Sequence, residues 1–212
     1  MSRRPNAPVW TCVAAGLLAY LALPWYAIQD TGWWEAIPQV FGSGEGANGV
    51  MQALLQGRDW LWIGVVGLAI CAVGGLLPAG RAQGRLLLVG GAVGAIGLAL
   101  GGFLIGARGW TLPILNAQLG ELPVNQFGIG AGGFIALTAL ILLGAFGLAR
   151  LGFFKGDLFV SGAVIGCGVL LAQFIAYPVS KALAGAFLDE NGRASFAAFV
   201  ARIGPERVWG PG

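Results

Sequence analysis

Long apolar segments alternate with shorter polar ones along the whole of this chain. A helix rises about 1.5 Å per residue, so about 20 apolar residues are enough to cross a bilayer. The apolar segments reach or approach that length. The pattern therefore predicts an all-α integral membrane protein, with a bundle of five transmembrane helices at about residues 8–28, 60–78, 86–106, 128–149 and 158–187.

Two of the polar segments, residues 29–59 and 107–127, are longer than a simple turn. Residues 29–59 carry short apolar clusters between glycines and acidic residues, which predicts interfacial helices lying on the membrane. An ordinary loop with aromatic anchors is the alternative. Residues 107–127 are interrupted by Pro113 and Pro123, so we expect them to lie in the interface or to dip partway into it.

Composition supports a membrane protein and removes several classes of enzyme. Of the 212 residues, 57% are hydrophobic and 10% are charged, whereas soluble domains carry about 25% charged residues. The chain has no histidine, which excludes Ser-His-Asp catalysis, HExxH zinc chemistry and haem ligation through histidine. Its three cysteines lie in three different apolar segments and form neither a disulfide framework nor a metal motif. We therefore expect no enzyme activity, no cofactor and no metal site.

The charges predict an orientation in the membrane. The net charge of +3 is spread over single or paired basic residues, so nucleic-acid binding is not predicted. With the amino terminus in the cytoplasm, eight of the nine acidic residues and six basic residues fall in the outer segments. The other six basic residues crowd into short inner segments, which favours this orientation: Arg3, Arg4, Arg81, Arg85, Arg150 and Lys155. We expect a cytoplasmic amino terminus and a carboxyl terminus on the outer side of the membrane.

Glycines recur four residues apart inside the apolar segments. Small residues at this spacing let two helix backbones approach closely in a membrane. We interpret four such pairs as helix-packing positions: Gly90 and Gly94, Gly97 and Gly101, Gly128 and Gly132, Gly162 and Gly166. Packing within the chain is the first interpretation, and a dimer or partner-subunit face is the alternative. Gly128, Gly130 and Gly133 match GxGxxG by letter, but they open an apolar segment, so helix packing is favoured over nucleotide binding.

Ionisable side chains are absent from the interiors of the first four predicted spans, and the fifth has only Lys181 near its outer end. An ion or proton pathway normally leaves such a residue within a span. Ser161, Thr138 and Gln173 could bridge helices by hydrogen bonds. The spans are therefore interpreted as scaffold rather than as a pathway.

The last apolar segment ends in a polar turn followed by a short amphipathic helix. Ser195 can cap this helix, whose apolar positions recur three and four residues apart until Gly204-Pro205 stops it. We therefore predict a five-helix membrane region over residues 1–187 and an extracytoplasmic turn and amphipathic helix over residues 188–212.

This junction, roughly residues 170–209, resembles the start of the transmembrane subunit of binding-protein-dependent ABC transporters, most closely the ferric iron permeases, with neighbours for thiamine and polyamines. The residues that carry the resemblance are Tyr177, Pro178, Phe187, Asp189 and Gly192. The preceding helices resemble the extra amino-terminal spans of some long permeases. The resemblance implies a permease for ferric iron or a comparable small solute, fed by a periplasmic binding protein and driven by a cytoplasmic ATPase.

The chain departs from that family in the parts that carry transport. No segment matches the EAA-type loop by which these permeases dock their ATPase, and no P-loop occurs. The sequence stops near Trp209, about where the family's transport core would begin. We therefore expect a scaffold for the transport core that is not competent alone, within a truncated or split permease. The alternative is a stand-alone small multi-pass membrane protein that acts as a scaffold or assembly partner.

Overall fold

The structure is a computed structural model. It describes residues 6–26, 37–44, 46–106, 109–110 and 129–176, together with Val179, Ala197 and Val200. The chain divides into two units, residues 1–166 and 167–212, and the first of them contains a helix bundle.

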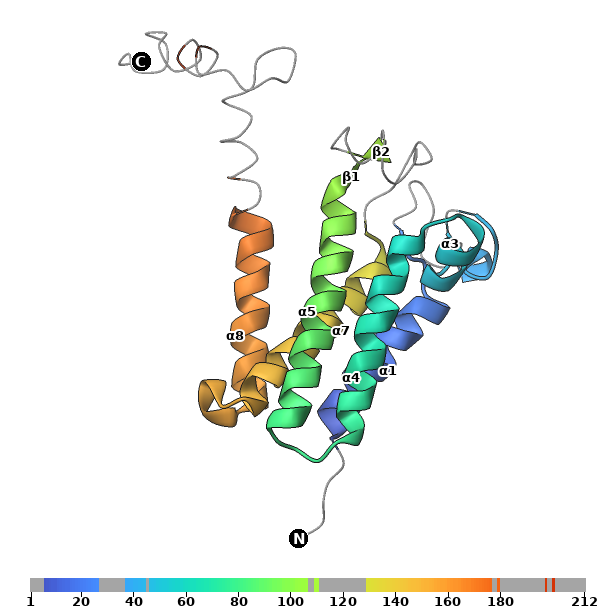
Figure 1. The fold of residues 1–212 in the computed structure, drawn as a ribbon. Coiled ribbons are helices and arrows are strands. Elements are labelled where there is room, and N and C mark those ends of the chain that lie inside the picture. The colour runs from blue at the N-terminus through green and yellow to red at the C-terminus, as the bar shows by residue number, and fades with distance from the viewer. Residues whose placement is uncertain are drawn as a thin grey trace. The chain divides into compact units, whose positions relative to one another are not determined.

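Four helices form this bundle (Figure 1): α1 (Ala7–Ala22), α4 (Trp62–Leu76), α5 (Arg81–Leu104) and α7 (Ala131–Arg150). α5 packs between α4 and α7, and α1 packs against both α4 and α7, so the four helices close into a ring. Large, fully buried side chains from all four helices fill its centre: Val9, Val13, Tyr20, Leu68, Cys71, Leu87, Leu140 and Leu143. The bundle therefore has one continuous apolar core.

Shorter elements connect these helices. They are the helix α3 (Gly49–Leu55), the 3₁₀ turns η1 (Ile37–Gln39), η2 (Asp59–Leu61) and η3 (Phe153–Gly156), and the strands β1 (Ile105–Gly106) and β2 (Gly109–Trp110). β1 and β2 pair antiparallel, with Ile105 opposite Trp110. α8 (Leu158–Leu171) follows η3, and its residues from Cys167 onward belong to the second unit, where the π-helical turn η4 (Ala172–Ala176) continues.

Four helical stretches within the described residues are long and apolar enough to cross a membrane: residues 59–76, 81–101, 131–150 and 158–175. They confirm the prediction of a helical protein with several membrane-length segments. α1 is apolar but has only 16 residues. A helix of that length is about 24 Å long, which is less than the roughly 30 Å hydrocarbon core of a bilayer.

α1 ends at Ala22, six residues before the predicted end of the first span. Pro24 explains this stop, because proline disfavours helical backbone in the residue before it and donates no hydrogen bond itself. Leu23 accordingly has an extended conformation, with φ −123° and ψ 148°. α5, in contrast, begins earlier than predicted, at Arg81 rather than at residue 86. Arginine, alanine and glutamine are good helix formers, so the helix includes the residues just before the predicted span.

The backbone that follows α1 is held by two other segments. The Asn48 side-chain amide donates to the Leu21 carbonyl at 2.9 Å, and the Trp25 amide donates to the Ala47 carbonyl at 3.1 Å. The amide of Gly132 donates to the Pro24 carbonyl at 2.9 Å. Polar backbone groups exposed by the early end of α1 are therefore paired within the protein, as an apolar environment requires.

Candidate functional site

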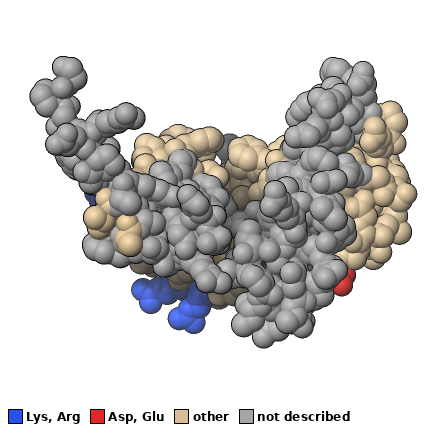
Figure 2. Space-filling model, turned by 90° about the horizontal axis from the view of Figure 1, so that it is seen from above, with Lys and Arg blue, Asp and Glu red and all other residues tan. Residues whose placement is uncertain are grey.

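Basic side chains gather at one end of the bundle. Arg81 and Arg85 lie in the first turns of α5, and Arg150 ends α7. These helix ends meet, because a Cβ on Gly84 would lie 2.9 Å from the Arg150 Cβ. Lys155 lies in η3, which packs against α7. We call this end of the bundle, defined by Arg81, Arg85, Arg150 and Lys155, the basic end. On the face shown in Figure 2, most of the surface formed by described residues is uncharged.

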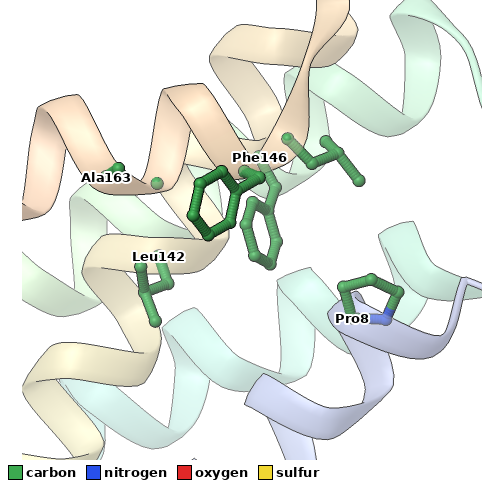
Figure 3. A pocket seen from close by; sticks show the side chains of 7 residues that line it. Pro8, Leu142, Phe146 and Ala163 are labelled. Atoms are coloured by element: carbon green, nitrogen blue, oxygen red, sulfur yellow. The ribbon is translucent and has the colours of Figure 1, made fainter.

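A pocket of about 390 Å³ lies between the start of α1, the second half of α7 and the start of α8 (Figure 3). Every residue that lines it is apolar: Pro8, Leu142, Phe146, Leu158, Phe159, Gly162 and Ala163. The pocket can hold an apolar group by burial, but its walls offer no side chain that could bind a polar substrate or take part in proton transfer.

The turn between α7 and α8 positions one wall of the pocket. Gly152, Phe154, Lys155 and Gly156 have positive φ values of 106°, 51°, 55° and 78°, so the chain reverses over a few residues. The Asp157 carboxylate then accepts hydrogen bonds from the amides of Phe159 and Val160 at 2.8 and 3.1 Å, which caps α8. The Ser161 hydroxyl donates to the Ala145 carbonyl at 2.5 Å and ties α8 to α7.

A second polar cluster lies at the opposite end of the bundle, around Arg58. This side chain is only 5% exposed. Its Nη1 donates to Gln52 Oε1 at 2.7 Å, and its guanidinium carbon lies 4.3 Å from the centre of the Tyr26 ring. Tyr20 contacts this end too, because its ring lies 4.3 Å from that of Trp25 and its hydroxyl donates to the Leu61 carbonyl at 2.9 Å. The contacts of Arg58 tie the segment before α4 to the segment that follows α1.

Three of the predicted packing glycines contact α4. A Cβ on Gly90 would lie 2.6 Å from the Gly67 carbonyl oxygen, and one on Gly94 would lie 3.3 Å from the Gly67 Cα. A Cβ on Gly97 would lie 2.5 Å from Ile63 Cδ1. Since real Cβ atoms do not approach other atoms so closely, a side chain at Gly90 would meet the backbone of α4 and force α4 and α5 apart. A side chain at Gly97 would meet only the side chain of Ile63, which can move aside.

The other predicted glycines have varied surroundings. A Cβ on Gly101 would lie 3.3 Å from Trp60, and one on Gly132 would lie 2.9 Å from the Pro24 carbonyl oxygen. Gly162 is in ordinary contact distance of Leu142 and Phe146 on α7, whereas nothing lies within 4 Å of a Cβ on Gly166. Gly128 lies outside the described residues.

Several other residues singled out in the sequence can now be placed. Thr138 does not bridge helices, because its hydroxyl donates to the Phe134 carbonyl of its own helix at 2.8 Å. Gln173 lies in η4. The junction residues that carry the family resemblance lie outside the described residues: Tyr177, Pro178, Phe187, Asp189 and Gly192.

Sequence reasoning missed a close backbone contact between α5 and α7 and the buried arginine. Gly91 on α5 and Gly144 on α7 face each other at backbone distance, but neither belongs to a pair four residues apart. The seven-residue spacing of Gly84 and Gly91, two turns of a helix, was the available signal. For Arg58, the available signal was its place two residues before Trp60 at the start of an apolar segment.

No described group of three or more histidine, cysteine, aspartate or glutamate side chains could hold a metal ion. Comparison with known proteins gives no further guide to the site: no family model, curated protein or solved structure matches this chain.

Proposed function

We propose that this chain is a membrane anchor and packing scaffold for a transport core, and that it forms no translocation path itself. The close approach of helix backbones inside the bundle carries this proposal. A Cβ on Gly91 would lie 2.5 Å from the Gly144 nitrogen, and a Cβ on Gly67 would lie 2.6 Å from the Gly90 carbonyl oxygen. Helices at this distance leave no room for a solute between them.

The buried polar side chains agree with a scaffold. Among the described residues, Asn48, Gln52 and Arg58 are buried at the end of the bundle that holds α3. Gln83 is buried at the basic end, and Ser161 is buried in the first turn of α8, which follows it. The side-chain amide of Gln83 on α5 donates to the Gly74 carbonyl of α4 at 3.3 Å, so this hydrogen bond connects the two helices. Polar groups that serve an ion pathway are expected along the interior of the spans, whereas these lie at the two ends.

The transport core is proposed from the sequence resemblance. Residues 170–209 resemble the entry of an ABC importer permease of the ferric iron type, whose partners would be a periplasmic binding protein and a cytoplasmic ATPase. The start of α8 supports a further membrane partner, because Phe159, Val160 and Val164 are 83%, 40% and 49% exposed. A permease core could pack against these side chains in the bilayer.

The same proposal includes five spans, with α1 as the first and the basic end in the cytoplasm of a bacterial inner membrane. Its support is the gathering of four basic side chains at one end of the bundle, since cytoplasmic loops carry an excess of lysine and arginine. At the other end, Phe41, Leu54 and Leu55 are 70%, 61% and 59% exposed. Exposed apolar side chains at a membrane surface favour an interfacial position for α3.

The second candidate is a stand-alone scaffold that assembles a different membrane partner. It is favoured by the self-contained core of the bundle, which includes side chains from all four helices.

Affinity purification of the tagged full chain from native membranes separates the two candidates. The transport proposal expects an ATPase subunit and a second permease segment with an EAA-type loop to come down with the chain. A chain that purifies with a different membrane protein supports the stand-alone scaffold. Solute uptake by vesicles that contain only the purified chain would contradict both.

A further inference from the structure

We propose that the pocket between α1, α7 and α8 holds an acyl chain of an anionic phospholipid, and that Arg150 and Lys155 bind its phosphate. This inference does not depend on the transport proposal. It requires only that the bundle lies in a bilayer.

The pocket suits a lipid chain rather than a polar ligand. Its volume is about 390 Å³ and its walls are apolar throughout. Phe159, on one wall, is 83% exposed, so the pocket opens away from the bundle core. Burying apolar surface in a wall of this kind needs no hydrogen-bonding partner, and the neighbours available within a bilayer are lipid tails.

One face of α7 connects the pocket to a positive charge. Leu142, Phe146 and Arg150 are spaced four residues apart and therefore lie in a row on the same face of the helix. Along the helix axis, Phe146 and Leu142 lie about 6 and 12 Å from Arg150. A phosphate beside Arg150 would thus place the first carbons of its acyl chain next to Phe146 and later ones next to Leu142.

The Arg150 side chain has capacity for a ligand. Its Nε is buried and has no hydrogen-bond partner in the described part of the chain. Most buried polar groups are paired, so an arginine left in this way about one helical turn from the pocket residue Phe146 is unusual. A phosphate can accept two hydrogen bonds from one guanidinium group.

Lys155 adds a second charge close to the pocket residue Leu158 in the sequence. It is exposed, and it precedes the pocket residue Leu158 by three positions, which is at most about 11 Å of chain. Asp157 lies between them, but its carboxylate already accepts from the amides of Phe159 and Val160. The charges of Arg150 and Lys155 favour an anionic headgroup over a zwitterionic one.

Titration of the detergent-solubilised full chain with two lipids tests the inference. The probes are dioleoyl phosphatidylglycerol and dioleoyl phosphatidylcholine, and bound lipid is counted by native mass spectrometry. We expect tighter binding of phosphatidylglycerol, by about fivefold for each cation, which corresponds to about 1 kcal/mol. Replacing both Arg150 and Lys155 by glutamine should remove that preference. The control R81Q/R85Q also removes two positive charges from the basic end, but it should keep most of the preference for phosphatidylglycerol.

A second pair of variants tests the pocket itself. Ala163→Phe fills the pocket, and Val164→Phe places the same ring on the next residue of α8, which does not line it. We expect Ala163→Phe to weaken binding of both lipids and Val164→Phe to leave it unchanged. Ala163→Leu repeats the test with a smaller side chain, and the melting temperature of each variant reports whether it is folded.

Three results would overturn the proposal. The first is equal binding of the two lipids by the unaltered chain. The second is a preference for phosphatidylglycerol that survives in R150Q/K155Q. The third is an Ala163→Phe chain that binds lipid normally but changes its oligomeric state, which would assign the pocket to a protein partner.

Discussion

Gly91 on α5 and Gly144 on α7 bring their helices to backbone distance, because a Cβ on Gly91 would lie 2.5 Å from the Gly144 nitrogen. Gly90, the residue before Gly91, brings α5 to backbone distance of α4, because a Cβ on Gly90 would lie 2.6 Å from the Gly67 carbonyl oxygen. Two adjacent glycines of α5 therefore serve two different helix interfaces. In a bilayer, where lipid tails are as apolar as the helix surfaces, such close packing is a main source of helix association.

Replacing Gly91 by alanine should destabilise the bundle. The added methyl group must push α5 away from α7, and overpacking of this kind costs about 1–3 kcal/mol. Thermal unfolding in detergent, followed by circular dichroism, measures the loss. Gly166→Ala is the control, because nothing lies within 4 Å of a Cβ there, and alanine is favoured over glycine in a helix by about 0.5–1 kcal/mol. A Gly91→Ala chain that unfolds no earlier than Gly166→Ala would contradict the packing interpretation.

Tyr20→Phe should cost about 1 kcal/mol, because it removes one buried hydrogen bond and leaves the ring in place. The lost bond is the one from the Tyr20 hydroxyl to the Leu61 carbonyl, 2.9 Å long, which joins α1 to the start of α4. Thr138→Ala removes a hydroxyl that is exposed and bonded within its own helix, so it should change the unfolding temperature little. The prediction is wrong if the two substitutions have equal effects.

Arg58 and Gln52 should be energetically coupled. Nη1 of Arg58 donates to Gln52 Oε1 at 2.7 Å in a buried site. A hydrogen bond to a charged group contributes about 1.5–3 kcal/mol. Arg58→Met and Gln52→Met should therefore each destabilise the chain, and the double variant should lose less than the sum of the single losses. Urea unfolding of the four proteins gives this coupling, and strictly additive losses would rule it out.

Ser43 and Lys155 should lie on opposite sides of the membrane, with Lys155 in the cytoplasm. Ser43 belongs to the end that contains α3, since the Gln56 side-chain amide donates to its carbonyl at 2.9 Å, and Lys155 belongs to the basic end. Single cysteines at these positions, in a chain lacking Cys12, Cys71 and Cys167, can be labelled with a membrane-impermeant maleimide. Only Ser43→Cys should react in intact cells. Reaction of Lys155→Cys from outside would reverse the proposed orientation.

Much of the helical architecture could be predicted because burial in lipid leaves a simple pattern. The run from Ala131 to Arg150 is apolar almost throughout, and both its helical state and its length follow from that. Boundaries were harder, since they depend on single residues. The sequence predicts a first span that reaches residue 28, but Pro24 ends α1 at Ala22, and other segments supply partners for the backbone groups left there.

The candidate sites were less predictable, because they are made by residues from different helices. The pocket joins Pro8 to Phe146 and Ala163, which are far apart in the sequence and individually ordinary. Gly90 and Gly94 could be identified from their spacing, whereas the facing of Gly91 and Gly144 depends on how α5 and α7 are rotated. That rotation is set by tertiary packing, and the seven-residue spacing of Gly84 and Gly91 does not fix it alone.

The hydrogen bonds that join Asn48 and Ala47 to the backbone at the end of α1 have a practical consequence for engineering. The segment that connects α1 to α4 could be chosen as the site of an epitope tag or replaced by a flexible linker. Asn48 and Ala47 in this segment are partners of Leu21 and Trp25, so a linker there would leave those backbone groups unpaired in an apolar environment.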